Sequence, residues 1–331
     1  AMMLTSAVFT LLVMLIGASR VESGAITIGV LMTFLQYTVR LWVPVRNLAE
    51  KFNLIQTSLT SGERIMDILD AVPAMHDTAT HDPSLSLRDG AIAFDDVWFS
   101  YPRRDEPVLR GISFDARPGA MIALVGDTGA GKSTIVHLLS RFYDATRGAV
   151  RIDGHDVRDF ALRNLRRGIA LVPQDVVIFA GTVRDNITLG DEASDDRIWA
   201  CLRAVRADAI IERLPGGLDH ELEESGKTLS VGERQLLSFA RALVRNPPIL
   251  ILDEATANVD TETEARIQAA LEQLTAGRTS VVVAHRLSTI RRADQILVLR
   301  HGEVVERGTH DALMEVDGEY ARLVRLHTRD G

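Results

Sequence analysis

The strongest chemical signal in the sequence is a glycine-rich loop that follows a short apolar run, Met121 to Val125. The loop satisfies the pattern G-x-x-x-x-G-K-[ST] in the strand-to-helix context that phosphate binding requires. Glycines let successive backbone N–H groups curl around phosphates, and the start of the next helix adds partial positive charge. A glycine turn without a ligand is the alternative that the complete pattern disfavours. The candidate binding residues are Gly126, Asp127, Thr128, Gly129, Ala130, Gly131, Lys132, Ser133 and Thr134.

Two side chains of this loop have specific chemistry. We expect Lys132 to reach the β- and γ-phosphates of a nucleotide, because its ammonium is the charged group of the motif. We expect Ser133 to place its hydroxyl on Mg²⁺. The loop therefore predicts both a triphosphate and its metal.

A pair of carboxylates supplies the second element. The apolar run from 249 to 252 ends in Asp253 and Glu254. Asp253 suits the acid that holds the metal in P-loop NTPases. Glu254 is placed to polarise a water that attacks the γ-phosphate, and such assistance is typically worth about 10²- to 10⁴-fold in rate. An exposed acidic pair that caps a strand is the alternative interpretation.

The surrounding pattern predicts the elements that hold these groups. After residue 90, short β-rich runs alternate with helical stretches, which is typical of an α/β domain with a mostly parallel sheet. Between Val172 and Pro247 only amphipathic helical segments are clear, so this part is expected to be a helical insertion. Residues 71–90 contain prolines and turn formers without helical periodicity, which predicts a linker.

The first seventy residues differ from the rest in charge. Residues 1–50 contain five of the 82 charged residues of the chain, and two apolar runs of 19 and 17 residues flank a short polar turn. Each run approaches the roughly 20 residues that cross a hydrocarbon core as a helix. A signal peptide is disfavoured because there is no basic segment before the first run and a second run follows at once. Because the first run begins at Ala1 without a flanking loop, we expect the chain to be cut from a longer one.

Basic residues follow the second apolar run. Arg46, Lys51 and Arg64 place the residues from 46 onward in the cytosol by the positive-inside tendency. Helical spacing of apolar residues continues to Leu69, so the second span is expected to continue as a long cytosolic helix. The predicted division is residues 1–70 for the membrane, 71–90 for a linker and 91–331 for the nucleotide domain.

Composition excludes other classes. The formal net charge is −8, which argues against a chain-wide basic surface for nucleic acid, so no nucleic-acid partner is expected. The single cysteine, Cys201, cannot form an internal disulfide, which fits a reducing compartment.

A third motif allows the chain to be compared with a known family. Residues 229–235 read LSVGERQ, between the phosphate loop and the stretch LILDEATANVD. With these motifs, residues 91–327 resemble the nucleotide-binding domain of an ABC transporter. The stretches VPQD, IFAGTVRDNI and AHRLS narrow the resemblance to exporters with fused membrane and ATPase parts, and the amino-terminal segment resembles the last two of six membrane helices. The resemblance implies a P-loop NTPase with a RecA-like core, an antiparallel β subdomain and a helical subdomain.

The resemblance also assigns roles. Tyr101 matches the aromatic residue that stacks on adenine, and an ordinary strand tyrosine is the alternative. Gln174 matches the loop glutamine that senses Mg²⁺ and water. His285 matches the switch histidine on the γ-phosphate, and without the matched context it would be a structural histidine. Asp260 matches the loop that communicates across a dimer of ATPase domains.

Residues 229–235, which match the signature segment of the family, depart from the family pattern. Ser230 and Glu233 form a capping-box pattern, so a well-capped helix is the plain interpretation. In the family this helix start, with Ser230 and the Gly232 N–H as donors, is offered to the γ-phosphate of ATP on the opposite subunit. Here Val231 replaces a glycine and Glu233 replaces a glutamine of the usual LSGGQ. The charge of Glu233 should weaken attraction for ATP, which leads to the hypothesis of a pair of different half-transporters.

The resemblance completes the functional expectation. The chain would bind ATP and Mg²⁺, hydrolyse ATP and couple closure of two ATPase domains to export of a small molecule, lipid or peptide. Its partners would be membrane lipid and a second half-transporter, either a copy or, as favoured here, a different chain. It would lie in a bacterial inner membrane with the ATPase domain in the cytoplasm. A soluble ABC ATPase and a weakly hydrolysing regulatory half are the alternatives.

Overall fold

The structure is a computed structural model that describes residues 2–73, 75–77, 81–102, 106–223, 228–253, 261–284 and 286–329. It divides into two compact units, residues 1–74 and residues 75–331. Each unit has its own packing, and the candidate chemistry lies in the second.

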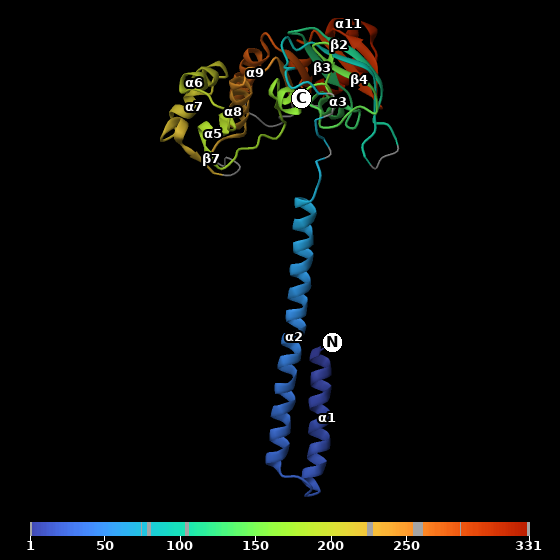
Figure 1. Ribbon diagram of the computed structural model, residues 1–331, viewed down its shortest axis with the longest axis vertical. Coiled ribbons are helices and arrows are strands. Elements are labelled where there is room, and N and C mark those ends of the chain that lie inside the picture. Colours follow the sequence, from blue (N-terminus) through green and yellow to red (C-terminus); the bar gives the residue numbers. More distant parts are fainter. Residues whose placement is uncertain are drawn as a thin grey trace. The chain divides into compact units, whose positions relative to one another are not determined.

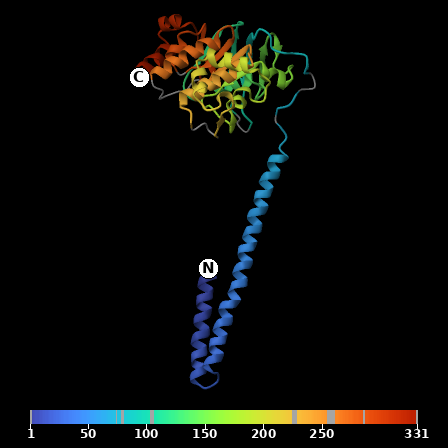
Figure 2. The same cartoon turned by 90° about the vertical axis from the view of Figure 1, so that its left-hand side faces the viewer.

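The first unit is a pair of helices that lie side by side, α1 (Met2–Glu22) and α2 (Ile28–Leu69) (Figures 1 and 2). Gly17 lets them approach, because a Cβ atom there would lie 2.2 Å from Leu31 Cδ1. Both helices are long and apolar enough to cross a membrane. The 42 residues of α2 extend over about 63 Å at 1.5 Å per residue, roughly twice a hydrocarbon core. The long second helix predicted from the apolar spacing is therefore present, with Pro44 inside it.

The second unit is built around a six-stranded sheet with the order β12-β11-β3-β10-β9-β6. All neighbours are parallel except β12, which is antiparallel to β11. Every residue of β10 is buried, as expected for a parallel strand that is covered on both faces. The strands are β3 (Met121–Val125), β6 (Ile169–Val172), β9 (Ile249–Asp253), β10 (Thr279–Val283), β11 (Gln295–Arg300) and β12 (Glu303–Gly308).

A second sheet is antiparallel and has the order β2-β1-β4-β5. Its core includes the stacked rings of Phe94 and Phe114, with centroids 4.6 Å apart. The register of β1 shifts against both neighbours beside Asp96, which has a positive φ of 43°. The strands are β1 (Ile92–Phe99), β2 (Leu109–Ala116), β4 (Arg147–Ile152) and β5 (His155–Asp156).

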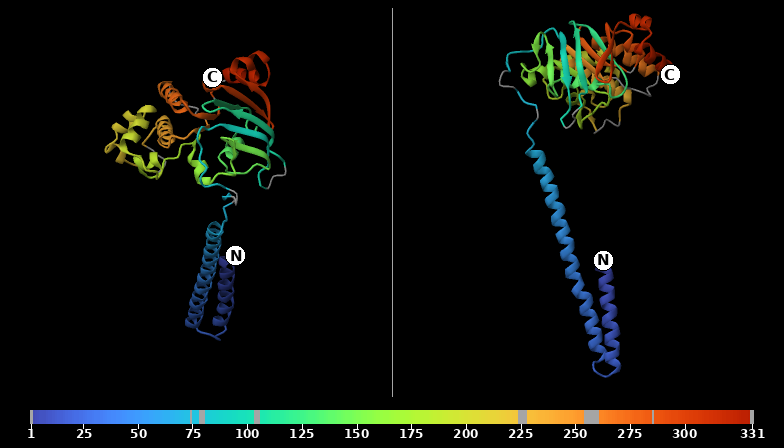
Figure 3. Two further views of the ribbon diagram at one scale, coloured as in Figure 1. Left: turned by 45° about the horizontal axis from the view of Figure 1, so that its top comes forward. Right: turned by 90° about the vertical axis from the view of Figure 1, so that its right-hand side faces the viewer.

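Helices occupy the chain between β6 and β9 and form a separate group beside the sheets (Figure 3). The predicted helical insertion is present, with one addition. A two-stranded ribbon pairs β7 (Gly181–Thr182) with β8 (Glu221–Leu222). Strands of two residues are too short to show the alternation of apolar and polar residues that predicts a strand. The insertion contains α5 (Val183–Thr188), α6 (Asp195–Ala204), α7 (Asp208–Glu212), the 3₁₀ helix η1 (Gly217–Asp219) and α8 (Val231–Val244).

The remaining helices belong to the second unit. They are α3 (Lys132–Leu139), α4 (Leu162–Arg167), α9 (Thr261–Thr275), α10 (Leu287–Ile290), α11 (His310–Val316) and α12 (Glu319–Arg329). The first of them begins inside the glycine-rich loop, so the predicted strand-loop-helix unit is present.

Residues 75–77 and 81–90 of the expected linker belong to the second unit, whereas residues 71–73 belong to the first. The Leu162 N–H donates to Asp77 Oδ1 at 2.7 Å, and Asn164 Nδ2 donates to Pro83 O at 2.8 Å. The Arg88 N–H donates to Asp153 Oδ2 at 2.8 Å. These bonds explain why the second compact unit begins at residue 75 and not at the first strand.

Candidate functional site

The glycines of the phosphate-binding loop are required by its backbone. Gly126 has a φ of +151°, and a Cβ there would lie 2.2 Å from the carbonyl oxygen of Leu299 on the neighbouring strand β11. Gly131 has a φ of +107°, and its Cβ would lie 2.6 Å from Leu109 Cδ2. At Gly126 a side chain would strike the backbone of β11, and at Gly131 the positive φ itself disfavours any other residue. Both positions therefore favour glycine.

Lys132 is folded over the loop from the first position of α3. Its Nζ donates to the carbonyl oxygens of Gly126 at 2.6 Å and Asp127 at 3.0 Å. Burial lowers the pKa of Lys132, while the nearby carboxylates of Asp127 and Asp253 raise it. These contacts fix a cation beside the first turn of a helix, where a phosphate would be bound.

The start of α3 leaves its own donors open. Its N-cap is Gly131, which has no side chain to accept from the first-turn N–H groups. Ser133 is exposed in this turn, and Thr134 is buried behind it. The helix end therefore presents unpaired N–H groups and a hydroxyl to the cavity in front of it.

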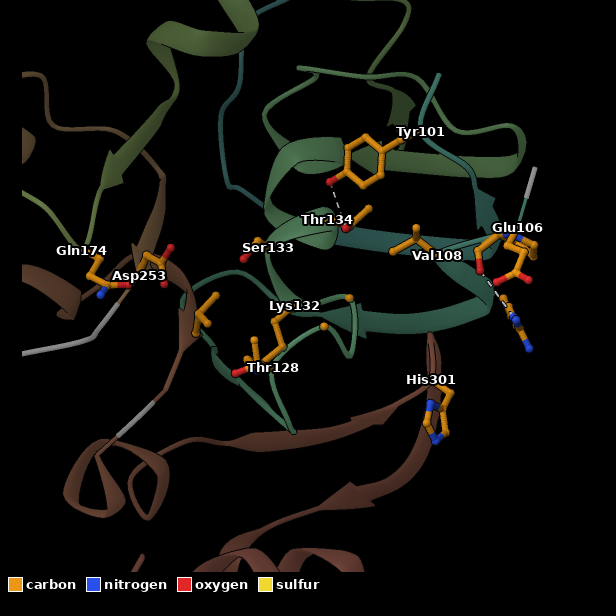
Figure 4. Close-up of a pocket in the computed structure, with 15 residues that line it drawn as sticks. Tyr101, Glu106, Val108, Thr128, Lys132, Ser133, Thr134, Gln174, Asp253 and His301 are labelled. Atoms are coloured by element: carbon orange, nitrogen blue, oxygen red, sulfur yellow. Dashed lines mark hydrogen bonds between the residues drawn. The ribbon is translucent and has the colours of Figure 1, made fainter. Parts of the chain in front are cut away.

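One cavity of about 970 Å³ brings together Tyr101, Gln174, Asp253 and six residues of the loop (Figure 4). The loop residues are Thr128, Gly129, Gly131, Lys132, Ser133 and Thr134, whereas the predicted residues Gly126, Asp127 and Ala130 do not line it. Gln174 and Asp253 lie together on one side of it, across from the phosphate-binding loop. They meet because β6 and β9 are neighbours with Val172 opposite Leu252, so the two chain segments leave the sheet at the same edge. The structure thus brings together groups that are 79 residues apart in the sequence.

Tyr101 forms another wall of the cavity (Figure 4). Its hydroxyl lies 3.0 Å from Thr134 Oγ1 and 3.2 Å from His137 Nδ1. The rings of Phe99 and Tyr143 pack against it in T-shaped arrangements, with centroids 4.8 and 5.1 Å away. These contacts fix the tyrosine ring at the cavity, where an aromatic side chain could stack on a planar base.

Sequence reasoning missed several lining residues. Glu106, Val108 and Arg110 lie before and within β2, and His301 lies in the turn between β11 and β12. The two segments touch, because a Cβ at Gly302 would lie 2.2 Å from Val108 O. No motif connects them, so only the fold places them at the cavity.

The signature residues lie elsewhere. The predicted capping box of α8 is confirmed: the Glu233 N–H donates to Ser230 Oγ at 3.2 Å, and the Ser230 N–H donates to Glu233 Oε2 at 2.9 Å. Ser230 is exposed, and Gly232 is buried against Thr263 of α9. Neither lines the cavity.

Three predicted site residues, Glu254, Asp260 and His285, lie outside the described residues. The strand that leads to the first of them, β9, is described to Asp253, and β10 leads to Ala284. Their roles therefore stay predictions from the sequence.

Comparison with known proteins shows which domain the chain carries. Residues 109–257 match a family model described as ABC transporter. The chain is 45% identical over 325 residues to the uncharacterized ABC transporter ATP-binding protein YknV of Bacillus subtilis (strain 168), covering 97% of this chain and 53% of that protein. The chain carries an ABC transporter domain. This ABC ATPase domain has the P-loop fold, so the predicted resemblance and fold are confirmed.

Other similar proteins add detail. An ATP-dependent lipid A-core flippase of Syntrophus aciditrophicus (strain SB) is 44% identical, over 95% of this chain and 52% of that protein. A solved structure of a bacterial Atm1-family ABC exporter with ATP bound has a TM-score of 0.73 and 37% identity, covering 97% of this chain and 57% of that one. The chain thus spans about half the length of the relatives it matches, and the match includes the two apolar helices.

Proposed function

We propose that this chain supplies the ATP-hydrolysing part of an ABC exporter and two of its membrane helices. The observation that supports this most is the convergence of the phosphate-binding loop, Asp253, Gln174 and Tyr101 on one cavity of about 970 Å³. A triphosphate needs charge and N–H donors at one end and an aromatic face at the other, and the cavity offers both. The apolar pair α1 and α2 in the same chain favours a transporter over a soluble ABC ATPase.

The cavity residues would contact different parts of the nucleotide. Tyr101 would stack on adenine, while Lys132 and the loop N–H groups would bind the β- and γ-phosphates. Glu254 would take a proton from the attacking water, and His285 would contact the γ-phosphate. Asp260 would belong to the loop that communicates with the second ATPase domain. These last three assignments rest on sequence motifs.

Magnesium fits the oxygen donors on this side of the cavity. Ser133 offers a hydroxyl, Asp253 a carboxylate and Gln174 an amide oxygen, and Mg²⁺ prefers few protein oxygens together with phosphates and water. The described residues contain no cluster of three or more His, Cys, Asp or Glu that would hold a metal without a nucleotide. The ion would neutralise charge that develops on the phosphates.

A second ATPase domain would complete the nucleotide site. Ser230 and the Gly232 N–H, at the start of α8, would contact the γ-phosphate of ATP held by the partner. The sequence favours a different half-transporter as partner, because Val231 and Glu233 depart from the usual signature. The structure weakens part of this argument, because the Glu233 side chain is ion-paired with Arg213. The argument for a different chain then rests mainly on Val231, whose side chain is 51% exposed at the helix start.

The membrane assignment follows from α1 and α2. Their large apolar side chains are mostly exposed in this chain, so we propose that lipid and further helices cover them. The basic residues after the second span favour a cytoplasmic ATPase domain in a bacterial inner membrane. The substrate would be a small molecule, lipid or peptide, and the flippase among the relatives supports the lipid.

The first test is removal of the proposed base. In the full-length protein, Glu254→Gln should keep ATP binding and lower hydrolysis by about 10²- to 10⁴-fold, because only the proton acceptor is lost. Binding is measured with a fluorescent ATP analogue and turnover by phosphate release. Glu315→Gln, at an exposed position on α11, is the matched control and should keep full turnover. Full hydrolysis by Glu254→Gln would place the base elsewhere.

A second experiment separates the possible partners. The ATPase rate of the full-length protein alone is compared with its rate in the presence of half-transporters encoded nearby. Strong stimulation by one partner supports a pair of different chains. A robust rate alone, unchanged by Glu233→Gln, contradicts that part of the proposal and favours two copies.

A further inference from the structure

The acidic residue in the signature segment is not a free charge. Glu233 is only 18% exposed, and both of its carboxylate oxygens are occupied. Oε2 accepts the backbone N–H of Ser230 at 2.9 Å. Oε1 forms a close ion pair with Arg213 Nη2. The sequence pattern alone suggested an uncompensated negative charge at this helix end, and the fold supplies its counter-charge.

Arg213 reaches Glu233 from a different part of the helical insertion. It is the C-cap residue of α7, 20 positions earlier in the sequence. The insertion carries this residue to the signature, because α7 and α8 contribute side chains to one shared core. The Arg213 side chain is 60% exposed, so the pair lies at the surface of the insertion and is partly screened by water.

The ion pair leaves the donors of the helix end available. The Ser230 hydroxyl accepts the N–H of Glu233, so its own proton remains free to be donated. The N–H groups of Val231 and Gly232 precede the first backbone bond within the helix, which the Arg234 N–H makes to Ser230 O. A carboxylate that swung outward would compete for these donors and repel a phosphate.

We propose that Arg213 is the positioning residue that makes the acidic signature compatible with ATP. It holds the Glu233 carboxylate back in the capping box and cancels its charge, so that Ser230 and the first-turn N–H groups can bind the γ-phosphate of the nucleotide on the partner. This inference rests on the proposed function. Glu233 is then not a defect in the signature but one member of an ion pair with Arg213.

The test is a two-residue cycle in the full-length protein, in whichever assembly hydrolyses ATP most strongly. Arg213→Gln should raise the ATP concentration for half-maximal hydrolysis about three- to tenfold, the range typical of a partly exposed charge near a helix end. The loss should grow at low ionic strength, because the exposed carboxylate is then less screened. Arg213→Gln combined with Glu233→Gln should recover most of the loss, and Arg213→Lys should stay close to the parent protein.

Controls make each outcome decisive. Arg203→Gln removes another exposed arginine of the same insertion, on α6, and should leave the ATP requirement unchanged. Thermal midpoints of all variants are measured, because a general loss of folding would lower the midpoint and would not be restored by Glu233→Gln. An unchanged ATP requirement in Arg213→Gln, or a loss that persists in the double variant, overturns the inference. Absence of ATP hydrolysis in the parent protein would instead refute the proposed function.

Discussion

Arg141 provides the sharpest stability test in the ATPase domain. It lies next to Ser140, the C-cap residue of α3, is 0% exposed and has a positive φ of 50°. Its Nε donates to Asp144 Oδ1 at 3.0 Å, Nη1 to Phe160 O at 3.3 Å and Nη2 to His76 O at 3.4 Å. One buried cation therefore joins the end of the phosphate-loop helix to β5–α4 and to the segment at the start of this domain.

We expect Arg141→Met to destabilise the domain by about 2–4 kcal/mol. Removal of one member of a buried ion pair costs roughly 3–5 kcal/mol in general, because the other groups lose their partner. The destabilisation expected here is smaller than this general range, because Asp144 is 37% exposed and can be solvated again. The carbonyl oxygens of Phe160 and His76 still lose their arginine donor. Methionine keeps the apolar stem of the side chain and the same backbone φ, so the loss comes from the guanidinium contacts and from the space that the guanidinium leaves.

The change is measured by thermal unfolding of the full-length protein, where this loss corresponds to a midpoint about 5–15 °C lower for a domain of this size. Arg203→Met, at an exposed position, is the matched control and should stay within about 0.5 kcal/mol of the parent. Combining Arg141→Met with Asp144→Asn should cost less than the sum of the two. A single Arg141→Met variant as stable as the control would refute the reasoning that this network holds the domain together.

Two further predictions follow from backbone and burial. Gly126→Ala should abolish ATP binding in a fluorescence titration, because its Cβ would lie 2.2 Å from Leu299 O. The control is Gly119→Ala, which should bind ATP normally, because Gly119 also has a positive φ but no atom within 4 Å of its Cβ position. Equal loss of binding in both variants would contradict the steric reason. Burial raises the pKa of Tyr320 to about 12, with the hydroxyl 2.7 Å from His310 Nδ1. Because the unfolded tyrosine ionises near pH 10, its contribution is full below pH 10 and is lost as the pH rises to about 12. The unfolding free energy of the parent should therefore fall faster over this range than that of Tyr320→Phe, and parallel curves would contradict the shift.

Local patterns predicted the elements of this domain well. The sequence predicts the phosphate loop between a strand and a helix, because glycine, lysine and serine at this spacing after an apolar run form the pattern of such a loop. The apolar run Met121 to Val125 predicted a buried parallel strand, and four of its five residues are buried. The pairing of β7 with β8 was not predicted, because two-residue strands depend on a partner about 40 residues away.

Non-local contacts account for what the sequence could not show at the site. Sheet order brings Gln174 beside Asp253, and a turn after β11 brings His301 to the same cavity. Each of these juxtapositions depends on long-range pairing, which no short window contains. The motif residues could be named from the sequence, whereas the residues that complete the cavity wall could not.

The signature segment shows how this limit affects functional reasoning. The spacing of Ser230 and Glu233 was sufficient to predict the capping box, because its two hydrogen bonds are local. The electrostatic expectation from the same local pattern is incomplete, because it considers the charge of Glu233 without Arg213. A side chain that departs from a motif can be judged only with the groups that face it, and here the facing group lies on a different helix.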